Sequence, residues 1–110
     1  MEYYRMGTII SVQFEVNGII ETQKCILAKS FDSNELFQVI TIDGWHAGEI
    51  EGYIKKEFNN NNTKNNLCTW GHLEKQLRER VFVNLKHLQL IEPKTITEKE
   101  ITKVRNLLKN

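Results

Sequence analysis

The chain has little that could cross-link it or anchor it in a membrane. Only two cysteines, Cys25 and Cys68, occur among 110 residues, so neither a disulfide framework nor the paired short spacings of a zinc site are present. No stretch approaches the roughly 20 apolar residues of a membrane-spanning helix, and residues 1–6 lack the apolar core of a secretory signal. We therefore expect a cytoplasmic protein with free thiols, no bound metal, no cofactor and no membrane partner.

The chain also lacks an excess of one charge. The chain has 15 Lys and Arg residues and 14 Asp and Glu residues, so its net charge is +1. This balance excludes a strongly basic coat protein for nucleic acid and an acidic mimic of it, so any nucleic-acid binding has to be local. A chain of 110 residues with 40% hydrophobic residues has room for one core, and we predict a single domain over residues 1–110.

Residues typical of β-strands are plentiful. Residues 10–16 alternate apolar and polar side chains, and Asn17-Gly18 follows, which predicts a type I′ turn and a partner strand from Ile19 towards Ala28. Residues 36–42 are β-branched and apolar, as is typical of a central strand. Further strands are predicted over residues 49–58, 81–85 and 89–91, with a single turn at 86–88, a polar mobile loop at about 59–66 and a boundary at Pro93.

Two helices are predicted. Leu73 and Leu77, four residues apart, favour a short amphipathic helix over residues 72–80. Thr97 followed by Glu100 forms a capping box, which predicts the start of a C-terminal helix. One apolar stripe of that helix, which would pack on the sheet or on another subunit, consists of Ile101, Val104 and Leu108. The pattern predicts a mainly β fold with some α: a small, curved antiparallel β-barrel closed by the C-terminal helix.

Three stretches resemble the PemK/MazF family of toxin endoribonucleases. Residues 7–14 (GTIISVQF) resemble the opening strand of the family, and residues 25–30 (CILAKS) resemble the apolar strand that follows its Arg-Pro pair. Residues 80–91, with the helix from Thr97, resemble its ending of strand, turn, short strand and helix. The resemblance implies an SH3-like barrel, a homodimer, metal-independent cleavage of single-stranded RNA through its 2′-hydroxyl, and a cognate antitoxin that lies across the RNA groove.

The resemblance also implies site residues. In the family, the arginine of the Arg-Pro pair stabilises the charge on the phosphate, but the matching pair here is Gln23-Lys24. Glutamine is neutral and cannot replace a guanidinium, whereas Lys24 could substitute from one position along, although strand neighbours point to opposite faces. Thr41 matches the family's assisting Thr. We therefore expect Thr41 and Lys24 among the catalytic residues and Gln23 among the RNA-binding residues.

A loop after Thr41 carries Asp43, Trp45 and His46. Because imidazole titrates near neutral pH, His46 is a candidate general acid or base, and the indole of Trp45 offers a face on which an RNA base can stack. The alternative is a partly buried tryptophan next to a solvated histidine. This alternative stays open from the sequence alone.

The densest positive charge lies on one predicted helix. Arg78 and Arg80, with Lys75, are candidate RNA phosphate ligands, because phosphate binding needs clustered cations. Glu74 and Glu79 flank them, so the alternative is a solvated face whose charges pair locally.

Two classes of function follow. The first is a toxin-type endoribonuclease of a toxin-antitoxin system. The second is a non-catalytic binding protein on the same barrel, such as an immunity, inhibitor or decoy protein, which is favoured by Gln23-Lys24 and by the near-neutral charge. An unrelated SH3-like adapter is a further alternative.

Overall fold

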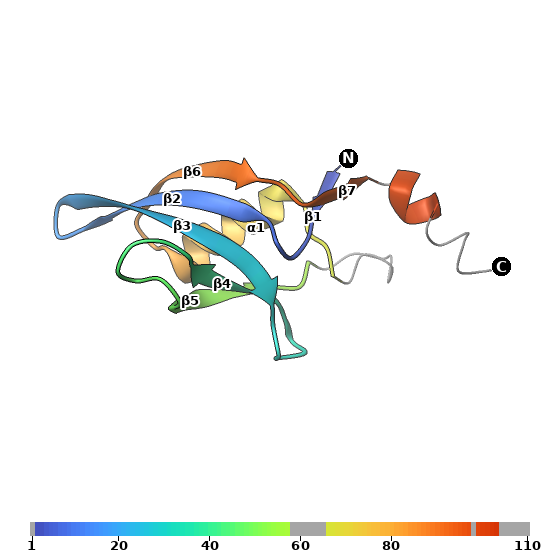
Figure 1. Cartoon of the computed structure of the whole chain (residues 1–110), viewed down its shortest axis with the longest axis horizontal. Coiled ribbons are helices and arrows are strands. Elements are labelled where there is room, and N and C mark those ends of the chain that lie inside the picture. The colour runs from blue at the N-terminus through green and yellow to red at the C-terminus, as the bar shows by residue number, and fades with distance from the viewer. Residues whose placement is uncertain (1, 58–65, 98, 104–110) are drawn as a thin grey trace.

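The chain forms antiparallel β-sheets that pack against one helical segment (Figure 1). The computed structural model describes residues 2–57, 66–97 and 99–103. A five-stranded sheet has the order β5–β4–β3–β2–β6, and a two-stranded sheet pairs β1 with β7. The strands are β1 (Glu2–Tyr4), β2 (Ile9–Val16), β3 (Ile19–Lys29), β4 (Glu35–Thr41), β5 (Ile50–Lys55), β6 (Leu85–Glu92) and β7 (Thr95–Thr97). The mainly β prediction is confirmed. No closed barrel is found in the described part of the chain, because β5 and β6 remain the two edges of the sheet.

The predicted hairpin is confirmed. Strands β2 and β3 pair in register from Val16 opposite Ile19 to Ile9 opposite Ile26. Asn17 and Gly18 have φ angles of 52° and 81°, as a type I′ turn requires. The predicted strand over residues 36–42 is also confirmed as a central strand, because β4 pairs with β3 on one side and with β5 on the other.

The helical segment consists of α1 (Trp70–Gln76) and a π-helical turn, η2 (Leu77–Val81). Thr69 caps α1, because its side chain accepts a hydrogen bond from the backbone N–H of His72 at 3.3 Å. Leu73 and Leu77 are fully buried, so the predicted apolar face of this helix is confirmed.

The predicted strand over residues 81–85 is wrong, because Val81 ends the helical segment. The N–H of Phe82 bonds to the carbonyl of Leu77, five residues earlier, which extends the turn to this point. Gly52 of β5 lets this turn approach closely: a Cβ at Gly52 would lie only 3.0 Å from Cγ2 of Val81. A contact between residues so far apart in the sequence has no local signal.

The predicted turn at residues 86–88 is also wrong, because β6 is one strand from Leu85 to Glu92 that pairs with β2, with shifts of register at Lys86 and Ile91. The strand ends just before Pro93, which has no N–H for a sheet hydrogen bond and marks the predicted boundary. The sheet of β1 and β7 was not predicted, because three residues are too few to show a periodic pattern.

The C-terminal helix begins where predicted but does not cover the sheet. Thr97 Oγ1 accepts a hydrogen bond from the N–H of Glu100 at 3.2 Å, which confirms the cap. This helix lies beyond β7, away from the five-stranded sheet, whereas α1 lies against the sheet (Figure 1). The expectation that it closes the barrel is therefore wrong for the described residues. Val104, Leu108, Phe58 and residues 59–65 of the predicted polar loop lie outside those residues.

One buried cluster joins the sheet, the helical segment and β1. Its members include Tyr4, Ile10, Val12, Leu27, Phe37, Val39, Ile54, Leu73, Leu77 and Phe82. Phe14 and Phe82 stack with ring centroids 5.2 Å apart, and Tyr4 and Trp70 meet at 5.4 Å. Among the described residues, no helix is long and apolar enough to cross a membrane.

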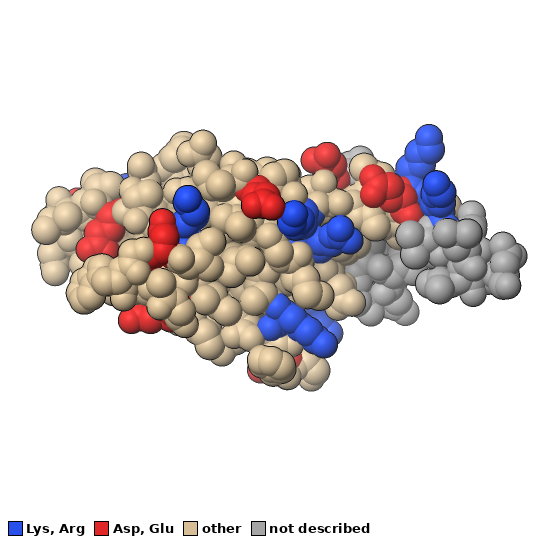
Figure 2. Space-filling model, viewed as in Figure 1, with Lys and Arg blue, Asp and Glu red and all other residues tan. Residues whose placement is uncertain are grey.

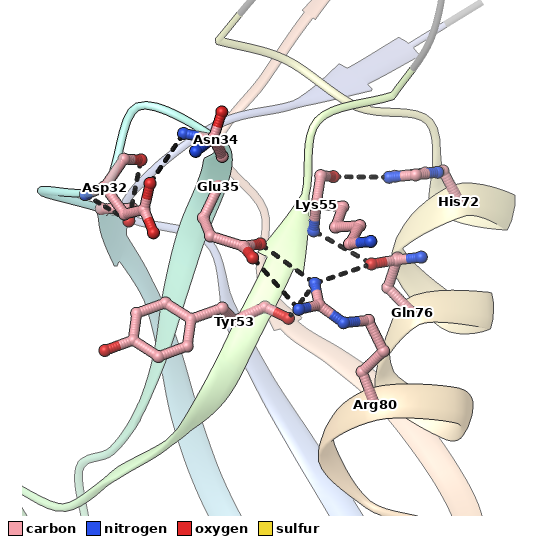
Figure 3. A network of polar contacts seen from close by, with 9 residues as sticks. Asp32, Asn34, Glu35, Tyr53, Lys55, His72, Gln76 and Arg80 are labelled. Atoms are coloured by element: carbon pink, nitrogen blue, oxygen red, sulfur yellow. Dashed lines mark hydrogen bonds and ion pairs between the residues drawn. The ribbon is translucent and has the colours of Figure 1, made fainter.

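Side chains of the helical segment bind the outer edge of β5 (Figure 3). The N–H of Lys55 donates to Gln76 Oε1 at 3.0 Å, and the Lys55 carbonyl accepts from His72 Nε2 at 2.7 Å. Arg80 Nη1 donates to the carbonyl of Tyr53 at 3.2 Å. Because these groups occupy the edge, β5 is not free to pair with a further strand.

Candidate functional site

Gln23 and Thr41, both predicted from the family resemblance, meet in a buried polar cluster. Thr41 Oγ1 lies 3.1 Å from Gln23 Oε1, 2.8 Å from Glu51 Oε1 and 3.8 Å from Cys25 Sγ. Thr41 and Cys25 are fully buried and Gln23 is 7% exposed. Burial raises the pKa of the Cys25 thiol to about 11, although its hydrogen bond to Thr41 acts in the opposite direction.

This cluster engages the Thr41 hydroxyl fully. A hydroxyl has one hydrogen, and the charged carboxylate of Glu51 at the shorter distance is its stronger acceptor. The other contact, to Gln23, is satisfied when the amide turns its NH₂ group towards Oγ1. With no exposed surface and two polar partners, Thr41 has no free path to an RNA phosphate. The arrangement suits a structural polar cluster that joins the middle of β3 to the end of β4 and to β5.

The loop between β4 and β5 lies beside this cluster and presents Trp45. The loop is tight, because the N–H of Ala47 bonds to the carbonyl of Gly44 at 3.2 Å and the N–H of Gly48 bonds to the carbonyl of Thr41 at 2.7 Å. The Trp45 residue is 90% exposed, and its ring lies 4.6 Å from the ring of His46. An indole held in the open by a tight loop is available for binding.

Acidic residues surround His46. Its Nδ1–H donates to Glu49 Oε2 at 2.9 Å, and this hydrogen bond is the main reason that the pKa of His46 is raised above 6.5. The more distant charges of Glu51 and Glu21 raise it further. The carboxylates of Glu49, Glu51 and Glu21 therefore favour the protonated form of His46.

A hollow lies between the loop and β3, and we call it the Trp45 pocket. Its lining residues are Glu21, Thr22, Gln23, Asp43, Gly44, Trp45 and His46. This lining contains two carboxylates and no Lys or Arg. Figure 2 shows several acidic side chains towards the left end of the molecule, with a basic one beside them, whereas acidic and basic side chains are interspersed towards the right. The Trp45 pocket is suited to a cation and not to a phosphate.

Lys24 is not brought into this pocket. Its backbone carbonyl accepts from the N–H of Ile42 at 2.8 Å, and its N–H donates to Asp43 Oδ1 at 2.9 Å. Lys24 lies opposite Ser11 in the pairing with β2. Because neighbouring strand residues alternate in direction, its side chain points to the face opposite Gln23. The backbone of Lys24, and not its ammonium group, shapes the site.

Arg78 and Arg80 also lie elsewhere, on η2. Arg78 Nε donates to Glu74 at 3.3 Å, which agrees with the local pairing considered as the alternative. Arg80 instead pairs with Glu35, whose Oε2 and Oε1 lie 3.0 and 3.1 Å from its two Nη atoms (Figure 3). That hydrogen bond raises the pKa of Arg80 and keeps its guanidinium charged. Both arginines bind within the protein.

Four of the predicted residues lie together in the structure, next to acidic residues that were not predicted. Gln23 and Thr41 touch each other, while Trp45 and His46 line the pocket next to Gln23. Glu21 and Glu51 were not predicted, because their proximity to this site depends on how β3, β4 and β5 align. Glu49 was also not predicted, although it follows His46 by three residues in the same loop and this spacing is a local signal.

Comparisons of the chain with protein-family models, with curated proteins and with solved structures find no match. Its function is therefore inferred from the geometry of the Trp45 pocket.

Proposed function

We propose that this chain is a non-catalytic binding protein that recognises a positively charged segment of a partner protein at the Trp45 pocket. The observation that carries the proposal is the composition of the pocket: a 90% exposed indole next to the carboxylates of Glu21 and Asp43, with no Lys or Arg in the lining. Tryptophan is the strongest aromatic partner of a cation and a frequent hot spot of protein interfaces. Carboxylates beside it favour Arg or Lys of a partner and repel RNA phosphates.

The strand order supports an SH3-like arrangement for this module. Strands β2 to β5 follow one another as an antiparallel meander, α1 and η2 come next, and β6 returns beside β2. We infer that the five-stranded sheet is a partly open SH3-like barrel in which the helical segment fills the space between the edge strands. A fold of this kind hosts many unrelated functions, so the binding proposal depends on the pocket alone.

The endoribonuclease expected from the family resemblance would need cations that no described Lys or Arg supplies to the Trp45 pocket, although His46 lines this pocket and has the chemistry of a general acid or base. An attacking 2′-hydroxyl requires cations at the phosphate and an accessible acid or base. Gln23 is neutral, Thr41 is fully buried and Lys24 faces away from the pocket. The nuclease remains a prediction, and direct measurement of RNA cleavage tests it.

Fluorescence polarisation tests the proposal with two probes: a short peptide that alternates arginine and valine, and an unstructured single-stranded RNA. We expect the peptide to bind, to weaken with added salt, and to lose about tenfold in affinity in Trp45→Ala, as a cation–π contact of about 1–2 kcal/mol implies. Asp43→Asn should also weaken it. The matched control is Phe31→Ala, because Phe31 is 95% exposed on the loop between β3 and β4 and should not affect binding.

Two results would contradict the proposal. One is equal peptide affinity in the natural protein and in Trp45→Ala. The other is cleavage of the RNA in the presence of a chelator with activity lost in Thr41→Ala, which would support the toxin-type endoribonuclease instead.

A further inference from the structure

Strand β3 is longer than the strand that pairs with its second edge. β2 pairs with β3 as far as its first residue, Ile19, whereas β4 pairs only with residues 25–29. At Lys24 the β4–β5 loop, and not β4, hydrogen-bonds to this edge of β3. The N–H of Ile42 donates to the Lys24 carbonyl at 2.8 Å, and the N–H of Lys24 donates to Asp43 Oδ1 at 2.9 Å. Residues 19–23 of β3 therefore have a strand on one edge only within the described part of the chain.

The backbone groups on the uncovered edge can be identified from the hydrogen-bond alternation. Leu27 bonds towards β2, since its N–H donates to the Thr8 carbonyl at 2.9 Å. Lys24 bonds towards the loop, on the other side. Because direction alternates along an antiparallel strand, the N–H and C=O of Thr22 and Ile20 point to the same side as those of Lys24. In the residues that the structure describes, no hydrogen bond from these groups to that side is found.

This open edge borders the Trp45 pocket. Three consecutive β3 residues, Glu21 to Gln23, form one wall, and the loop residues Asp43 and Trp45 lie in the other. Neighbouring strands of a sheet lie about 4.8 Å apart. A partner strand at this spacing from residues 20–22 would therefore lie in line with β4, on the side of β3 that the chain leaves after Thr41. Thr22 is exposed, so its edge is accessible to a partner.

The side chains around this edge favour one kind of occupant. Glu21 projects on the same face as Ile19 and Gln23, and Ile19 is 65% exposed at the hairpin end. A strand that alternates basic and apolar residues carries its basic side chains on one face, and when this face lies on the side of Glu21 it places a cation near Glu21, Asp43 and Trp45. Charge complementarity thus selects a basic segment and disfavours an acidic one.

We propose that an extended, basic segment of a partner protein adds as a strand to β3 at residues 20–22 and places an Arg or Lys side chain in the Trp45 pocket. This inference rests on the proposed function, which it deepens by naming the conformation of the partner. Main-chain hydrogen bonds to Thr22 supply affinity, and the pocket supplies selection for the cation.

Thr22→Pro tests strand addition directly, because it removes the N–H from the open edge while the hydrogen bonds to β2 involve other residues. The matched control is Thr22→Ala, which keeps the N–H. We expect the alternating arginine-valine peptide to bind Thr22→Pro at least tenfold more weakly than Thr22→Ala. In the natural protein, we expect the peptide to protect the Thr22 amide from hydrogen exchange. A further test uses the natural protein and two peptides, one N-methylated at the odd residues and the other at the even residues. Because only every second N–H of the bound peptide points towards β3, one of the two methylated peptides should not bind.

The outcomes separate the two proposals. If Trp45→Ala weakens binding but Thr22→Pro binds like Thr22→Ala and the Thr22 amide stays unprotected, strand addition is wrong and the proposed function stands. If the peptide binds no better than its glutamate-valine counterpart, the proposed function itself fails. If Thr22→Pro abolishes self-association of the protein, the occupant is a second copy of this chain and the inference of a basic partner is overturned.

Discussion

Replacement of Arg80 by alanine should destabilise the protein without altering what it binds. Arg80 makes two hydrogen bonds to Glu35, at 3.0 and 3.1 Å, and one to the carbonyl of Tyr53, at 3.2 Å (Figure 3). These bonds join η2 to the edge of the sheet, at β4 and β5. Arg80→Ala leaves the Glu35 carboxylate and the Tyr53 carbonyl without this donor.

The magnitude follows from how exposed the pair is. Hydrogen bonds to charged groups contribute about 1.5–3 kcal/mol when buried, whereas exposed ion pairs contribute about 0.2–1 kcal/mol. The side chains of Arg80 and Glu35 are 31% and 14% exposed, between these limits. We therefore expect Arg80→Ala to lower the free energy of unfolding by about 1.5 kcal/mol and the melting temperature by about 6 °C.

Urea denaturation followed by tryptophan fluorescence measures this effect. The control is Lys75→Ala, which removes an exposed cation from the same helical segment and should change stability by less than about 0.5 kcal/mol. Arg80→Ala combined with Glu35→Gln should cost less than the sum of the single variants, because they share one interaction. Equal effects of Arg80→Ala and Lys75→Ala, with additive double-variant energies, would refute the structural role. A large loss of RNA binding in Arg80→Ala at unchanged stability would restore Arg80 as a phosphate ligand.

Three further predictions concern packing, titration and thiol access. Gly52→Ala should lower the free energy of unfolding, measured by urea denaturation, by about 1–3 kcal/mol, because the new Cβ would lie 3.0 Å from Cγ2 of Val81. Adding Val81→Ala should restore part of this stability. If the double variant is as destabilised as Gly52→Ala alone, the contact is disproved. By NMR, the pKa of His46 should lie above 6.5, and Glu49→Gln should lower it. Since the pKa is raised in the folded protein, the His46–Glu49 pair stabilises the fold fully below about pH 6.5, and this stabilisation is lost as the pH rises through the folded pKa. A His46 pKa that is not raised would exclude the pair. Cys68 is 1% exposed and burial raises its pKa to about 12, so it should react with an aromatic disulfide reagent only after unfolding; fast reaction in the native protein would contradict its placement.

The parts of the fold that were predictable from sequence have local causes. Asn17-Gly18 favours positive φ angles independently of the rest of the chain. The Thr97 hydroxyl accepts a hydrogen bond from the N–H of Glu100, only three residues away. The strand patterns of β2 and β4 likewise reflect burial on the sheet. These features need no information about distant residues.

The parts that were not predictable depend on distant contacts. Residues 81–85 have strand-like composition, but Val81 packs against Gly52 and closes a helical turn instead. Arg80 was predicted as an RNA ligand, yet its carboxylate partner lies 45 residues away in sequence. The same applies to the candidate site: Thr41, Asp43, Trp45 and His46 are neighbours in the sequence, but the carboxylates of Glu21 and Glu51 come near them only through strand pairing.

The most direct test of cation recognition at the Trp45 pocket is an NMR titration that follows the indole N–H resonance of Trp45. This resonance is assigned from its absence in Trp45→Phe. The natural protein is titrated with the arginine-valine peptide and, separately, with single-stranded RNA. The account predicts that the peptide shifts this resonance in a saturable way and that RNA at the same concentration does not. A shift with RNA alone, accompanied by new RNA ends bearing cyclic phosphate, would contradict the account and establish the nuclease.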